Sequence, residues 1–241
     1  MESQGSSSAF APVDWWLVVD TASPRASLAL VRGCDLCAQW GVRSQQPSAH
    51  LVVADIAYLL ERVGVQPKEL SAVGALVGPG SFTGIRVGLA AVKGLAQPGN
   101  LPIVTATTLE VAASAVTVHE PTAVLVVQVS HRRDVHGQGF VVAPGKFPQA
   151  FTEALTGNVE QVLTLLAAQA PTARPGVITG DGLTLLDDER LSVIASDWLR
   201  HAPPLWTAPV AIPLLAARLA AGTTVSAADL TAFYVRAALA S

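Results

Sequence analysis

The chain has 241 residues, of which 51% are hydrophobic and only 14% are charged, with a formal net charge of −3 at pH 7. This length can form one large domain or two small ones with a substantial buried core. Charged residues make up about 25% of a typical soluble protein, so the imbalance indicates an apolar surface that another subunit covers. The negative charge argues against a general nucleic-acid-binding surface, which is normally basic.

Residues 1–14 are polar and rich in serine, without the basic start and apolar centre of a signal peptide. We expect them to form a disordered tail. No uninterrupted apolar run approaches the length of a membrane span. Cys34 and Cys37 lack the further ligands of a zinc site and suit a reducing compartment. These features predict a cytoplasmic protein with no membrane contact and no metal site.

The first half of the chain predicts strands alternating with helices. Short apolar runs predict strands, and they cover residues 15–20, 26–31, 36–42, 72–77 and 103–105. A helix is expected from Ser48, its cap, to about Val63, with Gly64 ending it. A second helix follows Gly80, and a short third helix begins near Leu109.

The second half partly repeats this order. It predicts strands over residues 123–129, 135–142 and 177–179, and a helix over 159–170. Two closing helices are expected over residues 210–221 and from 227 onward, after prolines at 203, 204 and 209. The repetition predicts two similar α/β lobes. The expected divisions are a first lobe over 15–110, a second and divergent lobe over 111–207, and C-terminal helices over 208–241 that pack back on the first lobe.

The most informative stretch runs from Leu76 to Ala96. An apolar strand breaks at Gly78-Pro79-Gly80, and a helix follows whose first turn carries Ser81 and Thr83 as candidate caps. One helix edge consists of small residues and one leucine, which are Gly84, Gly88, Ala91 and Leu95. A glycine inside a helix costs about 1 kcal/mol relative to alanine. A close helix–helix contact, inside the subunit or with a partner, would offset that cost.

The loop at Gly78–Gly84 has two interpretations. It is either a tight strand-to-helix turn or a cradle of backbone N–H groups that binds phosphate at a helix N-terminus. The glycine spacing matches neither the P-loop nor the dinucleotide-binding fingerprint. Spacing alone therefore leaves both interpretations open.

The run from Gly78 to Ala96 resembles the signature of the bacterial TsaB (YeaZ) family. Five further segments are similar to family motifs, and these are Val18–Ser23, Ser48–Leu51, Leu101–Val104, Thr108–Glu110 and the C-terminal Phe233–Arg236. Members of that family are paralogues of TsaD. The resemblance implies an α/β fold of two RNase H-like lobes, as in the actin-like, sugar-kinase-like ATPases (ASKHA), with mixed sheets flanked by helices.

The resemblance also implies a function. Family members are non-catalytic subunits that pair with TsaD, which transfers a threonylcarbamoyl group to the tRNA adenosine next to the anticodon; the ATPase TsaE joins the pair. We therefore expect a TsaD homologue and a TsaE homologue as partners, contact with tRNA only through the complex, and a homodimer when the chain is alone. No cofactor is expected to bind this subunit tightly, and any ATP is expected at the interface of the complex.

Two sets of site residues follow, and no residue is expected to be catalytic. The first set is a predicted partner interface on the two first-lobe helices: His50, Val52, Ile56, Leu59, Gly84, Ile85, Gly88, Leu89, Ala91, Val92 and Leu95. The second is a candidate nucleotide or phosphate loop: Asp20, Thr21, Gly78, Gly80, Ser81, Thr83 and Arg86. On this view, Gly88→Leu blocks association and leaves the chain folded.

Two other functions remain as alternatives. An active actin-like ATPase or small-molecule kinase would use Asp20, but the second lobe shows Val129-Ser130-His131 where family members often carry an Asp-Ala-Arg motif. Its metal would then lack one of two carboxylate anchors. A glycoprotease-type metallopeptidase is the weaker alternative, because no two histidines lie three or four residues apart on a predicted helix.

Overall fold

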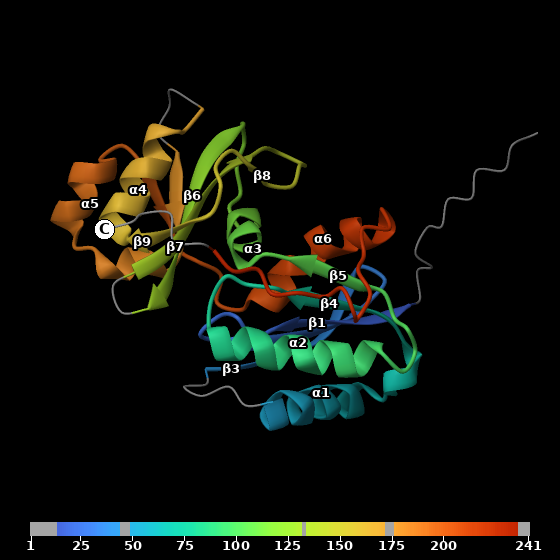
Figure 1. Ribbon diagram of the computed structural model, residues 1–241. Coiled ribbons are helices and arrows are strands. Elements are labelled where there is room, and N and C mark those ends of the chain that lie inside the picture. The colour runs from blue at the N-terminus through green and yellow to red at the C-terminus, as the bar shows by residue number, and fades with distance from the viewer. Residues whose placement is uncertain (1–13, 44–48, 132–133, 172–175, 236–241) are drawn as a thin grey trace, which may run out of the picture.

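A computed structural model describes residues 14–43, 49–131, 134–171 and 176–235. Its elements form two α/β lobes (Figure 1). The first half contains β1 (Trp15–Asp20), β2 (Ala26–Arg32), β3 (Asp35–Val42), α1 (Ala49–Val63), the 3-10 helix η1 (Pro67–Glu69), β4 (Leu70–Leu76), α2 (Phe82–Ala96), β5 (Ile103–Ala106) and α3 (Thr108–Ser114). The second contains β6 (Thr122–His131), β7 (Asp134–Val142), β8 (Gln149–Ala150), β9 (Leu155–Asn158), α4 (Val159–Ala168), β10 (Val177–Thr179), the 3-10 helix η2 (Asp181–Leu185), α5 (Asp188–Ala195), β11 (Leu199–His201) and α6 (Thr207–Ala220).

The two sheets repeat one topology. The first has the order β3-β2-β1-β4-β5, with β1 antiparallel to β2 and parallel to β4. The second has the order β11-β10-β6-β7-β8, with β6 antiparallel to β7 and parallel to β10, and with β9 also paired to β7. In each lobe the first strand therefore pairs antiparallel with the second, and a later strand pairs parallel with the first on its other side. The two-lobe α/β fold expected from the sequence is confirmed.

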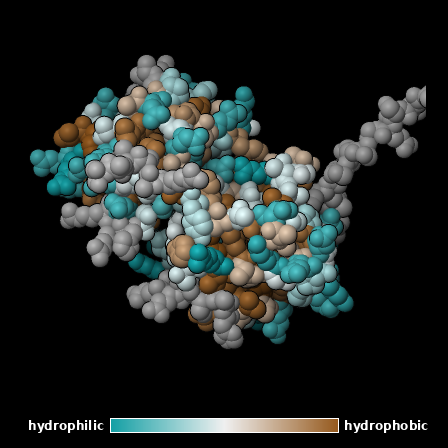
Figure 2. Space-filling view, viewed as in Figure 1, coloured by the Kyte–Doolittle hydropathy of each residue, from teal (hydrophilic) through white to brown (hydrophobic). Residues whose placement is uncertain are grey.

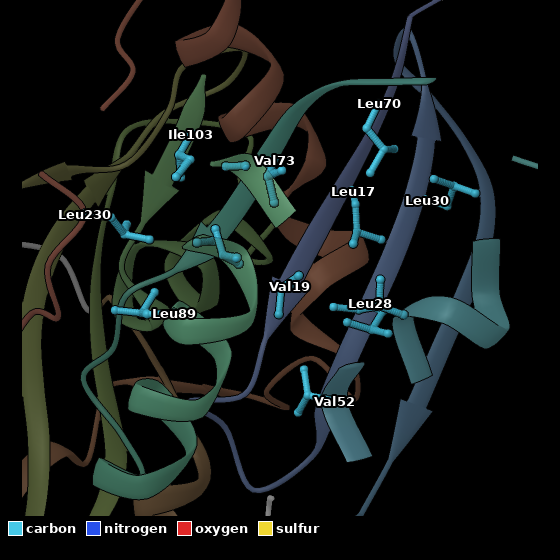
Figure 3. Close-up of a cluster of buried hydrophobic side chains, with 14 of the residues drawn as sticks. Leu17, Val19, Leu28, Leu30, Val52, Leu70, Val73, Leu89, Ile103 and Leu230 are labelled. Carbon is cyan, nitrogen blue, oxygen red and sulfur yellow. The ribbon is translucent and has the colours of Figure 1, made fainter. Parts of the chain in front are cut away.

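Strand alternation gives the first sheet two apolar faces. Leu17 and Val19 of β1 belong to a core cluster with α1 and α2, whereas Trp16 and Val18 belong to a cluster with α6. Successive side chains of a strand point to opposite faces, so one short apolar strand can hold helices on both sides. Figure 3 shows the first cluster, in which side chains from the strands meet Val52 of α1 and Leu89 of α2.

The second sheet is covered in the same way. Leu125 and Val127 of β6 pack with α4, and Val124 and Val126 pack with α3. The helix α3 lies where the lobes meet. Thr108 Oγ1 lies 2.6 Å from the carbonyl oxygen of Pro79, in the first lobe, and 2.8 Å from Oε1 of Gln128, at the end of β6, so its one proton can be donated to either acceptor. The candidate phosphate loop is thereby attached to the second lobe.

Most predicted elements are found within a few residues of their expected bounds. The backbone of Gly64 has φ +80° directly after α1, which only glycine adopts without strain, and the Ser81 side chain accepts a hydrogen bond from Gly84 N at the start of α2.

Ser48 lies outside the described residues, as do residues 1–13 of the expected tail. Sequence patterns missed β8, β9, β11 and α5, which are short or weakly apolar. The predicted division at residue 110 falls inside α3, and the lobe boundaries stay predictions.

One predicted helix was wrong. Residues 227–235 form no helix, and this part of the chain instead crosses the first lobe in irregular conformation. Val225 exchanges two backbone hydrogen bonds with Ile103, and Phe233 N donates to Val77 O (2.8 Å). These bonds to β5 and to the end of β4 satisfy backbone groups that a helix would have paired internally. The helix α6 begins at Thr207, so Pro209 lies in its first turn. A proline is tolerated there because the first N–H groups of a helix have no partner within it.

In the described part of the chain, no helix is long and apolar enough to cross a membrane.

Arg218 of α6 forms a half-buried ion pair with Glu110 of α3. One guanidinium nitrogen lies 2.6 Å from Glu110 Oε1, and the other donates to the Thr105 carbonyl oxygen (2.7 Å). Burial by itself would raise the pKa of Glu110, but the hydrogen bonds and charge of Arg218 and the cap bonds of Thr107 outweigh it and hold that pKa below its ordinary value.

We expect a double-mutant cycle of Arg218→Met and Glu110→Gln to give a coupling free energy of about 1 kcal/mol near neutral pH, from chemical denaturation. Because the pKa of Glu110 is lowered on folding, this stability is present above the unfolded-state pKa and is lost as the pH falls through the folded-state value. A coupling that persists unchanged in acid would contradict the assignment.

Candidate functional site

The helices α1 and α2 lie side by side on one face of the first sheet (Figure 1). Six apolar residues of the predicted partner interface point into this chain's own core, at 0–7% exposure: Val52, Ile56, Leu59, Ile85, Leu89 and Val92. A side chain already covered by its own sheet offers a partner no surface, so this part of the prediction was wrong. Ala91 and Leu95 are half-buried against the same core. The side chain of His50 lies outside the described set.

The glycine edge of α2 faces the turn after β1. A Cβ on Gly84 would overlap the backbone oxygen of Thr21, and a Cβ on Gly88 would overlap the Thr21 side chain. The Thr21 hydroxyl donates to Gly84 O (2.7 Å) across this contact. Both glycines are therefore occupied inside the subunit and do not form a partner contact. Of the two interpretations of the small-residue edge, contact within the subunit is the one observed, and it is to a turn instead of a helix.

The outer side of the helix pair carries exposed apolar residues together with an arginine. On α1, Leu51, Ala54 and Tyr58 repeat at helical spacing, with Leu51 52% and Tyr58 46% exposed. On α2, Phe82 is 54% exposed and begins a stripe. Figure 2 shows brown, hydrophobic patches between teal ones on the face of the first lobe that carries these helices. We call Leu51, Ala54, Tyr58, Phe82, Arg86 and Ala90 the outer face.

Sequence reasoning missed most of the outer face for an identifiable reason. The broad apolar stripe of each helix, which includes Ile56 on α1 and Ile85 on α2, belongs to the core, whereas the sequence prediction places it against a partner. The signal was present, since a helix that lies on a sheet must first bury its widest apolar stripe there. Any second stripe, such as Leu51 and Tyr58, is then left for the surface.

An aromatic and cationic group stands at the start of α2. The guanidinium carbon of Arg86 lies 3.8 Å from the centre of the Phe82 ring, and the Tyr234 ring lies 5.7 Å from that of Phe82. Tyr234 comes from the C-terminal segment, which the backbone bond from Phe233 N to Val77 O holds beside this loop. Two segments singled out in the sequence, the glycine-rich run and the C-terminal motif, thus meet at one surface.

The candidate phosphate loop is closed by its own chain. Ser81 N donates to Ala22 O (2.8 Å), Gly84 N donates to Ser81 Oγ (3.1 Å), and a Cβ on Gly80 would overlap Ala22 O. The turn after β1 therefore occupies the space over the loop where a phosphate would approach these N–H groups. Thr83 and Arg86 are exposed at the outer surface, away from this contact.

Asp20 is fully buried, and both oxygens of its carboxylate accept hydrogen bonds. Oδ1 accepts from Ala22 N (2.8 Å) and Ser23 N (3.3 Å), and the Thr207 hydroxyl at the start of α6 donates to Oδ2. Burial raises the pKa of Asp20 above its ordinary value, although these hydrogen bonds act to lower it. The carboxylate joins β1 to α6 and serves as a structural link between two elements of one lobe.

These contacts decide whether the nucleotide and metal of the actin-like ATPases would fit here. A phosphate needs free N–H groups in the loop, and a metal needs a carboxylate oxygen with open space before it. Ser81 N and Gly84 N of the loop and both oxygens of Asp20 are bonded inside the chain, and Ala22 lies against Gly80, so the residues present do not fit that arrangement. Among the residues the structure describes, no group of three or more His, Cys, Asp or Glu could hold a metal ion.

A family model described as "TsaD: tRNA N6-adenosine threonylcarbamoyltransferase" matches residues 45–180, more than half of the chain. The chain belongs to the TsaB (YeaZ) family of TsaD paralogues. A curated relative, the tRNA threonylcarbamoyladenosine biosynthesis protein TsaB of Bacillus subtilis, is 29% identical over 98 residues. That match covers 41% of this chain and less than half (43%) of the relative.

Two solved structures share the fold of this TsaB-family chain. One is an uncharacterised protein with similarity to peptidase YeaZ from Pseudomonas aeruginosa, with a TM-score of 0.76 and 20% identity over 93% of this chain and all of that one. YeaZ from Pseudomonas aeruginosa gives a TM-score of 0.72 and 20% identity, over 92% of this chain and all of that one. At this identity the likeness concerns the fold alone.

The glycine edge of this TsaB-family chain offers a matched pair of substitutions. We expect Gly88→Ala to reduce the free energy of unfolding by about 1–3 kcal/mol, because its Cβ overlaps Thr21. Gly94→Ala, on the same helix with nothing within 4 Å, should increase stability by about 0.5–1 kcal/mol. Urea denaturation measures both, and a neutral Gly88→Ala would contradict the packing described. The same contact means that Gly88→Leu should destabilise the fold, so the expectation that this variant stays folded was wrong.

Proposed function

We propose that this chain is a non-catalytic subunit that pairs with a TsaD homologue and supports transfer of a threonylcarbamoyl group to the tRNA adenosine next to the anticodon. The observation that carries the proposal is the outer face of α1 and α2, an apolar surface on a helix pair that this chain leaves exposed. Family membership supplies the reaction, because family members support TsaD in this modification.

The composition of the outer face supports docking. Interfaces between proteins are enriched in aromatic residues and arginine relative to other surfaces. Tyr58, Phe82 and Arg86 are of these types, and Tyr234 extends the group beyond α2. Helix pairs with an exposed apolar stripe bury it by packing against a second helix pair. We infer that the outer face packs against helices of the partner.

The first lobe supports a role without catalysis. The turn after β1 covers the glycine-rich loop, and Asp20 spends both oxygens on bonds to its own chain. An active ATPase or kinase needs these groups for phosphate and metal, so the closed loop counts against that alternative. Turnover of ATP by the isolated chain would instead favour it.

The remaining partners follow from the same proposal. A TsaE homologue joins the pair, tRNA binds only through the complex, and any ATP binds at the interface of the complex, in the cytoplasm. Without its partner the chain forms a homodimer through the same outer face, because an exposed apolar surface of this kind favours self-association.

The direct test is co-purification of tagged chain with the cognate TsaD homologue, followed by a tRNA modification assay. We expect a stable complex, and modified tRNA only when this chain is present. Full modification in its absence would overturn the proposed role.

Substitutions on the outer face test the interface. We expect Tyr58→Glu and Phe82→Glu each to weaken binding to the TsaD homologue by about thirtyfold or more, because a charge would be buried against apolar helices. Val193→Glu, at a residue of α5 that is 83% exposed in the second lobe, is the matched control and should not change the affinity. Affinity is measured by calorimetry, and circular dichroism checks the fold. If Val193→Glu weakened binding as much as Tyr58→Glu, the interface assignment would fail.

A further inference from the structure

The first sheet ends in a long edge strand, β3, and among the described residues no strand pairs with its outer side. An edge strand presents a row of unpaired backbone N–H and C=O groups, to which another strand can bind. The other sheet edges are protected, because β8, β9 and β11 have at most four residues and β5 exchanges two backbone hydrogen bonds with Val225. With eight residues, β3 is the described edge most open to pairing.

The side chains of β3 do little to block such pairing. Natural edge strands are usually protected by lysines, prolines or bulges. The strand contains neither lysine nor proline, and its one register shift lies beside Cys37, so Ala38–Val42 pairs regularly with β2. Leu36, Trp40 and Val42 are apolar and 37–45% exposed. A regular, exposed and apolar edge of this kind favours association with another strand.

Trp40 is held in place before any partner binds. Its ring centre lies 5.2 Å from that of Tyr58 of α1, at an interplanar angle of 62°. Burial raises the pKa of Asp55 above its ordinary value, although a hydrogen bond from the Trp40 indole acts to lower it. An aromatic side chain that is already oriented loses little conformational entropy when a partner covers it, and tryptophan is enriched among the residues that dominate binding.

The two ends of β3 carry opposite charges. Asp35 is its first residue, Arg43 directly follows its last, and both are exposed. An extended strand keeps its two ends apart, so these charges cannot meet within one chain. Antiparallel pairing with a second β3 places the start of each strand beside the end of the other, which brings opposite charges together twice. Parallel pairing would place like charges side by side.

We propose that β3 pairs antiparallel with β3 of a second copy of this chain, about a two-fold axis at Gln39. Gln39 lies midway between Asp35 and Arg43, so this register forms both charge pairs at once. It sets each Trp40 opposite the small Ala38 of the other copy, and it places the two Gln39 amides, which can donate and accept hydrogen bonds, opposite each other. The two five-stranded sheets then become one continuous sheet.

This surface differs from the one proposed for the TsaD homologue. The pairing uses the margin of the sheet, whereas the outer face lies on α1 and α2, and Tyr58 stands at the border between them. A chain bound to the TsaD homologue through its outer face keeps β3 free. Two such pairs would therefore join through β3 into a 2:2 assembly, a consequence that rests on the proposed function, whereas pairing of the isolated chain does not.

Cysteine cross-linking tests the register. In a full chain that carries Cys34→Ser and Cys37→Ser, we expect Gln39→Cys to form a disulfide-linked dimer under mild oxidation, because directly opposite Cβ atoms of antiparallel strands lie about 4.5–5.5 Å apart. The matched control is Gln149→Cys, at an exposed position of β8, the short edge strand of the second sheet. Equal cross-linking of the control, or none at Gln39→Cys, would overturn the proposal.

Charge exchange tests the pairing without cross-links. Analytical ultracentrifugation uses a chain with Phe82→Glu, so that association through the outer face is weakened. We expect this chain still to dimerise, Arg43→Glu to weaken the dimer by about tenfold or more, since each change acts twice, and Asp35→Lys added to Arg43→Glu to restore it. Lys146→Glu, in the exposed loop between β7 and β8, is the control and should have no effect. Circular dichroism checks that each variant is folded.

Three results of the charge exchange would contradict the proposal: a monomeric Phe82→Glu chain, a dimer that Arg43→Glu and Lys146→Glu affect equally, or no recovery when Asp35→Lys is added. Failure of the proposed function is recognised separately, because co-purification and calorimetry with the TsaD homologue report on the outer face whether or not β3 pairs.

Discussion

The first lobe depends on one close approach, that of the turn after β1 to the edge of α2. Thr21 lies against Gly84 and Gly88 at a distance that leaves no room for a Cβ, and its hydroxyl bonds to the backbone of the helix. Glycine inside a helix is unfavourable by about 1 kcal/mol, and this contact is what offsets it. The same turn places Ala22 against the glycine-rich loop, and Asp20 before it accepts a hydrogen bond from Thr207, so these contacts link β1, α2 and α6.

This packing leaves the first lobe with a closed interior and a separate exposed outer face. In its interior, the turn after β1 covers the glycine-rich loop, and the carboxylate of Asp20 is hydrogen-bonded within the chain. The broad apolar stripes of α1 and α2 cover the sheet, and the narrower stripes through Tyr58 and Phe82 remain outside. The side chains of the outer face are not part of the core clusters.

The second lobe has the same topology as the first, but different residues line its side of the space between the lobes. Its sheet supplies His201 and Gln128 to the space between the lobes, and the bond from Val129 N to Asp181 Oδ1 (2.9 Å) places one acid there, from η2 instead of from β6. The lobes meet through Thr108, which bonds to Pro79 and Gln128.

Local patterns in the sequence determined the order of elements, the cap at Ser81, the helix stop at Gly64 and the two-lobe fold, because hydrophobic periodicity and turn residues act over a few positions. They could not determine which side of a helix is buried by the chain and which stays exposed, as Ile56 and Tyr58 show, since that depends on where the sheet lies. The close contact at Gly88 and the hydrogen bond from Thr207 to Asp20, 187 positions away, also became visible only in the tertiary structure. A small residue shows that something approaches closely, and only the fold decides what it is.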